Sequence, residues 1–191
     1  VGRNMTAIKV DDEVVICDMG IHVSNYIKLT NDEDLQNISL DQLHKAQAIP
    51  NDSTINDWKD KVLAIIPTHA HLDHVAAIPF LAGQYKCPVY GTPFTIEVLS
   101  ANLQNEKIDL PNKLHKVNPN SKIRLSKNIE VEFINITHST PQTVMLAIHT
   151  KYGSIVYAND FKLDYTPTLG QKPNVERLKQ IGQGKVLALI S

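Results

Sequence analysis

The segment that most constrains this chain is HAHLDH, residues 69–74, which places three histidines and an aspartate within six positions. It follows directly on KVLAIIPT, residues 61–68, an apolar run whose branched residues predict a buried strand. Loops at strand ends often carry functional side chains on a rigid scaffold. Imidazoles crowded together without a cation are mutually unfavourable, because each ring that protonates repels its neighbours. The segment therefore predicts a metal site at the end of a strand.

The spacing within the segment divides its four side chains into two pairs. In extended backbone alternate residues share a face, so His69 and His71 can present their rings to one ion. If the chain then turns into a short helix, Asp73 and His74 point elsewhere and can hold a second ion. We therefore expect two ions side by side on one loop.

Two further donors stand at the ends of other predicted strands. His138 ends the run IEVEFINITH, and Asp160 ends the run SIVYAND. We expect His138 to complete the site of the first pair, and Asp160 to bridge both ions, because a carboxylate has two oxygens that can coordinate. Neither ligand set is closed, so water or substrate must complete the coordination.

Asp18 closes another predicted strand, in VVICDMG. A metal-bound histidine usually passes its second ring proton to a carboxylate or a carbonyl, and we predict that Asp18 has this orienting role rather than that of a direct ligand. The alternative is a carboxylate that caps the turn before Gly20.

Three polar residues near the predicted ligands are candidates for contacts with a substrate phosphate: Ser139, Thr140 and Lys162. Hydrogen bonding within the turn is the alternative for the two hydroxyls. A solvated side chain is the alternative for the lysine. The remaining histidines lack a partner pattern and are expected to be ordinary surface or core residues: His22, His44, His115 and His149.

Strand-like and helix-like segments are mixed along the chain. β-branched runs predict strands at 5–10, 13–19, 61–67, 87–91, 129–138, 143–149, 154–160 and 185–191. Capping signals predict helices over 39–47, 93–105 and 175–182. The early strands form a hairpin, so we expect a layered α/β fold of mixed sheets with outer helices rather than a doubly wound parallel sheet. The polar stretch Tyr26–Asp60 is interpreted as an excursion from the core.

Composition limits the class of protein. The 191 residues, 42% of them hydrophobic, suffice for one globular domain over residues 1–191. No apolar run approaches the roughly 18 residues of a membrane span, and no signal peptide is evident, so we expect a cytoplasmic protein. Cys17 and Cys87 do not form a CxxC pair, which argues against a thiolate zinc site. Both ends run through strand-like sequence, so we expect a longer polypeptide.

The net charge of the chain bears on whether it can bind nucleic acid by itself. The chain carries a formal charge of −1 and no dense Lys/Arg tract. An autonomous nucleic-acid binder usually shows a basic footprint. A polyanionic substrate would therefore need a local site, or another domain, to hold it.

Together, HAHLDH, His138, Asp160 and CDMG resemble the metallo-β-lactamase superfamily, whose hallmark is HxHxDH. Within it, VGRNMTAI, VICDMGI, THAHLDHVAAIP, GTPFTIEVL, ITHSTPQTV and YGSIVYANDFKLD are most similar to β-CASP nucleases of the archaeal ribonuclease J type. The resemblance covers nearly the entire chain. Gln142 differs from it, because the family often has an aspartate there. The β-CASP insertion and the C-terminal return, with another ligand for the second metal, would follow Ser191.

The resemblance implies an αββα sandwich, two zinc ions and hydrolysis of phosphodiester bonds in single-stranded RNA, typically from the 5′ end. Two cations can activate a shared water as hydroxide and stabilise charge on the phosphate, and Asp73 could orient that water or accept its proton. Manganese or iron would also suit imidazole and carboxylate donors.

Two other functions stay open. The first is a hydrolase of a small ester, thioester or lactone with the same fold, and the second is a metal-binding module that is inactive as an isolated chain. A homodimer of the full-length protein is one option, since the sequence does not determine the oligomeric state.

Overall fold

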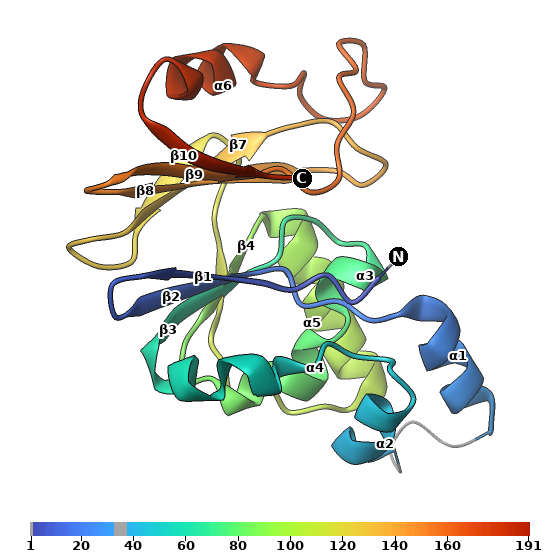
Figure 1. Cartoon of the computed structure of the whole chain (residues 1–191). Helices are drawn as coiled ribbons and strands as arrows, with labels where there is room; N and C mark the ends of the chain where they lie inside the picture. Colours follow the sequence, from blue (N-terminus) through green and yellow to red (C-terminus); the bar gives the residue numbers. More distant parts are fainter. Residues whose placement is uncertain (1, 33–37) are drawn as a thin grey trace.

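The computed structural model describes residues 2–32 and 38–191. Two five-stranded sheets face each other (Figure 1). The first has the order β1 (Thr6–Val10), β2 (Glu13–Cys17), β3 (Val62–Ile66), β4 (Val89–Gly91), β5 (Leu114–Lys116). The second has the order β10 (Val186–Ile190), β9 (Gly153–Tyr157), β8 (Val144–Thr150), β7 (Glu130–Asn135), β6 (Ser121–Arg124). Only β1 runs antiparallel to its neighbour in the first sheet, and only β10 pairs in parallel in the second. Both sheets are therefore mixed, as predicted.

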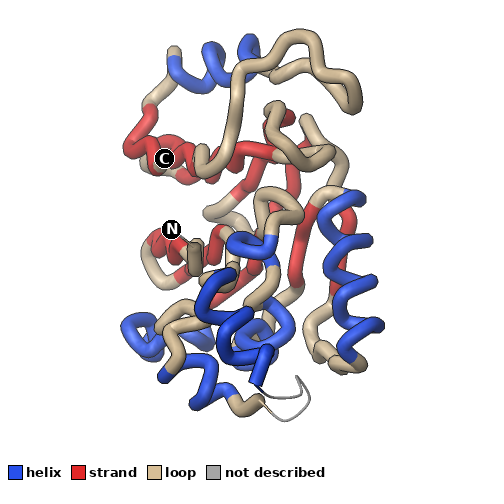
Figure 2. The backbone as a smooth tube through the Cα atoms, turned by 90° about the vertical axis from the view of Figure 1, so that its right-hand side faces the viewer, coloured by secondary structure: helices blue, strands red, loops and turns tan. Residues whose placement is uncertain are grey.

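Helices cover the outer face of each sheet (Figure 2). On the first sheet's side lie α1 (Val23–Asp32), α2 (Leu40–Lys45), η2 (Asp52–Lys61), α3 (Leu72–Val75), α4 (Ile78–Leu81), η3 (Ala82–Gln84) and α5 (Pro93–Glu106). The outer face of the second sheet carries α6 (Val175–Gly182). This arrangement confirms the expected αββα sandwich.

Alternation along the strands explains the layers. In β2, Val15 and Cys17 pack between the two sheets, whereas Val14 and Ile16 pack against the helices outside. Successive side chains of a strand point to opposite faces, so a strand buried on both faces reads as a continuous apolar run. A third cluster, which includes Met145 of β8, packs beneath α6.

The three predicted helices are confirmed by α2, α5 and α6. Ser39 and Gln42 form the expected capping box at the start of α2. Asn174 caps α6 by accepting a hydrogen bond from Arg177 N at 3.2 Å. Pro93 occupies the first turn of α5, but Thr92 makes no side-chain cap there.

The interpretation of Tyr26–Asp60 as an excursion from the core was wrong. Leu43, Ile49 and Ile55 are buried in the cluster between the first sheet and its helices. A few apolar side chains spread among polar ones are enough to hold this segment on the sheet, because each is almost fully removed from water. Residues 33–37 of this stretch lie outside the described residues.

Strands β5 and β6 were not predicted. Both are short, polar strands at the edge of their sheet, and they carry little of the apolar alternation that marks a half-buried strand.

In the part of the chain that the structure describes, no helix has the length and apolar character needed to cross a lipid bilayer.

Candidate metal centre

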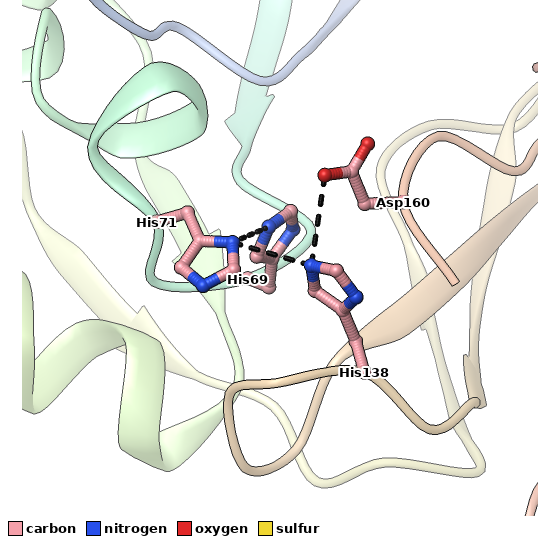
Figure 3. Close-up of side chains that lie close together, drawn as sticks. All are labelled: His69, His71, His138 and Asp160. Atoms are coloured by element: carbon pink, nitrogen blue, oxygen red, sulfur yellow. Dashed lines mark hydrogen bonds and ion pairs between the residues drawn. The ribbon is translucent and has the colours of Figure 1, made fainter. Parts of the chain in front are cut away.

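Four predicted ligands converge where the carboxyl ends of strands from both sheets meet (Figure 3). His69 and His71 follow β3, His138 follows β7, and Asp160 follows β9. One ligand atom from each of these side chains lies within 4.8 Å of all the others. His71 Nδ1 is 3.0 Å from His69 Nε2 and 3.2 Å from His138 Nε2. Three imidazole nitrogens and a carboxylate oxygen thus face one small volume.

The second predicted pair lies beside this group. The short helix α3 begins after His71, as expected, and carries Asp73 and His74, but the His74 ring stays close to the first pair, with its centroid 4.1 Å from that of His69. His74 Nε2 lies 3.7 Å from Asp73 Oδ2 and 3.6 Å from Asp160 Oδ2. The same Asp160 oxygen is 3.5 Å from His138 Nε2. A single carboxylate oxygen, rather than one for each group, stands between the two sets of donors.

Hydrogen bonds outside the cluster set the protonation of the rings. Thr68 Oγ1 donates to Asp18 Oδ1 at 2.9 Å, so this hydroxyl can only accept from His69 Nδ1, at 3.0 Å. His69 Nε2 is then unprotonated and faces the cluster. Burial, followed by the charge of His74, lowers the pKa of His69 to about 3, which keeps the ring neutral. A neutral ring with a free lone pair is the form that binds a metal ion.

The surroundings of His138 and His71 also favour neutral rings with a nitrogen available to an ion. Burial and the neighbouring His71 lower the pKa of His138. His71 Nε2 lies 3.1 Å from Ser139 Oγ, on the side of the ring away from the cluster. A ring proton on Nε2 that bonds to this hydroxyl leaves His71 Nδ1 free for an ion.

Asp18 lies fully buried behind residues 69–74, which are called the metal loop from here on. Besides the Thr68 hydroxyl, its Oδ1 accepts from Thr68 N at 2.7 Å. Its Oδ2 accepts from His74 Nδ1 and from the Tyr157 hydroxyl, both at 2.9 Å, and from Asn159 Nδ2 at 3.2 Å. Burial alone would raise the pKa of this carboxyl, but the hydrogen bond and charge of His74, with Thr68 N–H and His69, lower it overall. Asp18 therefore stands as a carboxylate beside His74 Nδ1, and its orienting role stays a prediction.

The loop after β2 supports the backbone of the metal loop. Met19 N donates to His74 O at 2.7 Å, and Ile21 N donates to Leu72 O at 3.1 Å. Gly20 lies so close to this backbone that a Cβ there would meet Asp73 O at 1.7 Å. The sequence reasoning missed this function of Gly20, although the glycine in CDMG was its visible signal.

The three predicted phosphate contacts line a groove of about 460 Å³ next to His138. Ser139 lies against His71, and Thr140 Oγ1 bonds within its own turn to Thr143 Oγ1 at 3.0 Å. Lys162 Nζ pairs with Asp164 Oδ2 at 3.4 Å. The groove brings a cation and two hydroxyls to the edge of the metal centre.

Gln142, the residue at which the sequence differs from the family, also lines this groove. Its Oε1 accepts a hydrogen bond from Phe94 N at 2.8 Å. Phe94 belongs to the first turn of α5, whose own Thr92 makes no side-chain cap. Gln142 thus caps this helix from the loop that carries His138.

Known proteins with similar sequences belong to a family with this fold. The model of the beta-lactamase superfamily domain matches residues 38–183. Ribonuclease J of Methanocaldococcus jannaschii is 43% identical over 192 residues, which cover 100% of this chain and 43% of that protein. Ribonuclease J of Pyrococcus abyssi is 40% identical over 193 residues, covering 100% of this chain and 42% of that protein.

A solved structure has a similar fold. It is a metallo-beta-lactamase HARLDQ motif mutant from Cronobacter sakazakii, with a TM-score of 0.57 and 12% identity over 95% of this chain and 66% of that one. The chain spans less than half the length of the two ribonuclease J proteins. The resemblance in the motifs is therefore confirmed over the whole chain, and the chain belongs to the beta-lactamase superfamily, with ribonuclease J proteins among its homologues.

Proposed function

We propose that this chain is the N-terminal metallo-β-lactamase part of a ribonuclease that hydrolyses phosphodiester bonds of single-stranded RNA from the 5′ end. The observation that carries the proposal is the convergence of His69, His71, His138 and Asp160 on one volume. Homology to ribonuclease J along the full chain supports RNA as the substrate class.

The donors fit two zinc ions. His69, His71 and His138 would hold one ion, Asp73 and His74 the other, and Asp160 would be shared between them. Neutral imidazoles and carboxylates are zinc donors, and sets that leave open positions are typical of catalytic rather than structural sites. Manganese and iron accept the same donors. When bound, such ions lower the pKa of a water molecule and offset the negative charge of a phosphate.

Asp73 is the residue that we assign to proton transfer. Its carboxylate stands beside His74 Nε2, and its side chain is 29% exposed, so a water molecule can reach it. A carboxylate in this place can orient the attacking water and accept its proton. Asp18 would act through His74, by keeping the proton on Nδ1 of that ring.

The groove beside His138 is the proposed path of the substrate backbone. Lys162 brings a positive charge, and Ser139 and Thr140 bring hydroxyls that can donate to phosphate oxygens. The formal charge of −1 leaves little general attraction for RNA, so these local contacts and the rest of a longer protein would hold it. Buried free thiols at Cys17 and Cys87 suit the reducing cytoplasm in which we place the protein.

The test uses RNA labelled at its 5′ end, with the full-length protein loaded with zinc. Release of mononucleotides from the 5′ end supports the proposal. Internal fragments alone would contradict the exonuclease direction, and turnover of a thioester or lactone in place of RNA would favour the small-substrate hydrolase. Zinc bound to residues 1–191 without activity, regained when the remaining sequence is restored, would identify the isolated chain as a metal-binding module.

A matched pair of variants assigns the activity to this site. Asp73→Ala removes the proposed proton acceptor, and Asp57→Ala removes an exposed aspartate of η2. We expect the first to lose at least about 100-fold in hydrolysis while the second stays near wild type, in line with the size of general-base effects. Normal turnover by Asp73→Ala at controlled zinc would rule out its assigned role.

A further inference from the structure

The N-terminal arm, Gly2–Asn4, is held beside the metal loop by backbone hydrogen bonds. Arg3 N donates to Ile21 O at 3.1 Å, and Gly20 N donates to Asn4 O at 3.0 Å. Asn4 N then reaches the metal loop itself and donates to Asp73 O, also at 3.1 Å. The arm runs beside α3, far in sequence from the residues it contacts (Figure 1). Asn4 therefore holds a defined place at the edge of the metal centre.

The side chain of Asn4 points at the two donors of the second ion. Its Nδ2 lies 3.0 Å from Asp73 O, 3.4 Å from Asp73 Oδ2 and 3.1 Å from His74 Nε2. In the neutral ring that a metal ion binds, His74 Nδ1 donates a hydrogen bond to the Asp18 carboxylate, so His74 Nε2 is the hydrogen-bond acceptor. The amide of Asn4 is the matching donor, and it also reaches the carboxylate of Asp73.

From this geometry we propose that Asn4 is a positioning residue for the second ion, which it serves by holding Asp73 and His74 in their ligand geometry. This inference rests on the proposed metal centre. Without an ion, the amide satisfies the lone pair of His74 and draws the Asp73 carboxylate toward it. When an ion takes the lone pair of His74 Nε2, the hydrogen bonds to Asp73 can stay in place.

The effect should be confined to the second ion. Within residues 2–32 and 38–191, the side-chain hydrogen bonds of Asn4 go to Asp73 and His74 and not to His69, His71 or His138. Residues that orient metal ligands through hydrogen bonds contribute a factor of roughly 10 to 100 in metal affinity. Ligands held in place before binding lose less conformational entropy when the ion arrives.

The experiment compares Asn4→Ala with Asn25→Ala. Asn25 is a matched control, because its Nδ2, like that of Asn4, donates to the backbone, here to Ala46 O at 3.0 Å and Gln47 O at 3.3 Å, away from the metal loop. Metal-free protein is titrated with Co²⁺ and followed by calorimetry and by the absorption bands of the bound ion. For Asn4→Ala we expect affinity for the second equivalent to fall about 10-fold or more, with altered second-equivalent bands and an unchanged first equivalent. Asn25→Ala should bind both equivalents as the wild type does.

The outcomes separate the inference from the proposal beneath it. If the wild type takes up no second equivalent, the two-ion centre is wrong and the inference falls with it. If wild type and Asn4→Ala bind two equivalents with equal affinity and equal spectra, the centre stands and the inference is wrong. An equal loss of both equivalents in Asn4→Ala would also contradict it, because that would be a general effect on the fold.

Discussion

The buried carboxylate of Asp18 accepts a hydrogen bond from His74 Nδ1 at 2.9 Å, and neither side chain is exposed to solvent. This contact joins the loop after β2 to helix α3. It also decides which nitrogen of His74 faces Asp73 and Asp160. Asp18→Asn would replace an acceptor by an amide that can donate to Nδ1, which favours the proton on the opposite nitrogen. We expect affinity for the second ion to fall about 10- to 100-fold, measured by metal titration.

The control for Asp18→Asn is Asp52→Asn. Asp52 is also buried and accepts a hydrogen bond from the Tyr85 hydroxyl at 2.8 Å, but it lies in η2 on the outer side of the first sheet. Both variants should lose stability to urea, and only Asp18→Asn should lose metal affinity. Equal metal affinities in the two variants would show that Asp18 is structural.

Gly20→Ala should damage the metal loop directly. The added Cβ would meet Asp73 O at 1.7 Å and His74 N at 2.3 Å, so the peptide between these residues must move. We expect a loss of several kcal/mol of stability, as for severe overpacking, and loss of the second metal equivalent. Thermal unfolding and metal titration check both. Gly182→Ala, where a Cβ would meet nothing within 4 Å, should change neither by much; wild-type metal binding by Gly20→Ala would contradict this reading of the loop.

Ser139→Ala distinguishes two functions of one hydroxyl. The sequence left a substrate contact and a hydrogen bond within the turn as alternatives, whereas the structure places Ser139 Oγ 3.1 Å from His71 Nε2. If the hydroxyl fixes the tautomer of His71, the variant should bind the first metal equivalent about 10-fold more weakly. If it contacts RNA instead, metal binding should be unchanged and KM should rise. Titration with Co²⁺ and steady-state kinetics on RNA decide between them.

Gln142→Ala should destabilise the chain by about 1 kcal/mol, the usual cost of removing a helix cap. The reason is that Gln142 Oε1 accepts from Phe94 N at 2.8 Å, where α5 has no cap of its own. Urea denaturation is the measurement. Gln104→Ala, on the exposed side of α5, should stay within about 0.5 kcal/mol of wild type. Equal stability of the two variants would mean that the cap contributes little.

The pair Glu132 and Arg177 makes stability depend on pH. Two guanidinium nitrogens of Arg177 lie 2.6 and 3.0 Å from the Glu132 carboxylate, which is nearly buried. Burial would raise the pKa of Glu132, but the hydrogen bonds from Arg177 and His149 outweigh it, and the pKa falls below its usual 4.5. Its stabilisation is therefore complete above pH 4.5 and is lost as the pH drops through the lower folded-state value.

Glu132→Gln tests this pair. At about pH 7 the free energy of unfolding of the variant, measured in urea, should be about 2 kcal/mol lower than that of the wild type. This difference should shrink as the pH falls below the pKa of a free glutamate carboxyl. Glu176→Gln removes an exposed partner of Lys179 and should have little effect at any pH. A difference that is constant with pH would show that the charge of Glu132 is not the cause.

Much of the site could be predicted because its ligands stand directly after strands with a clear apolar pattern. HAHLDH follows β3, and both His138 and Asp160 follow strands of the second sheet. Asn4 could not be found in this way, since its contact with Asp73 depends on how the N-terminal arm crosses the loop after β2. The burial of Leu43 was missed because most of its sequence neighbours are polar, so the single apolar face of this segment that packs on the sheet gives a weak pattern.

The positions of the ligands have a mechanical consequence for the whole sandwich. His71 follows a strand of the first sheet, and His138, 67 residues later, follows a strand of the second, yet their ring nitrogens lie 3.2 Å apart. An ion held by both would be a cross-link between the sheets and would close a long loop of the chain, much as a disulfide does. The sheets could then separate only after that ion is released, so the chain's resistance to being pulled apart would follow the supply of metal.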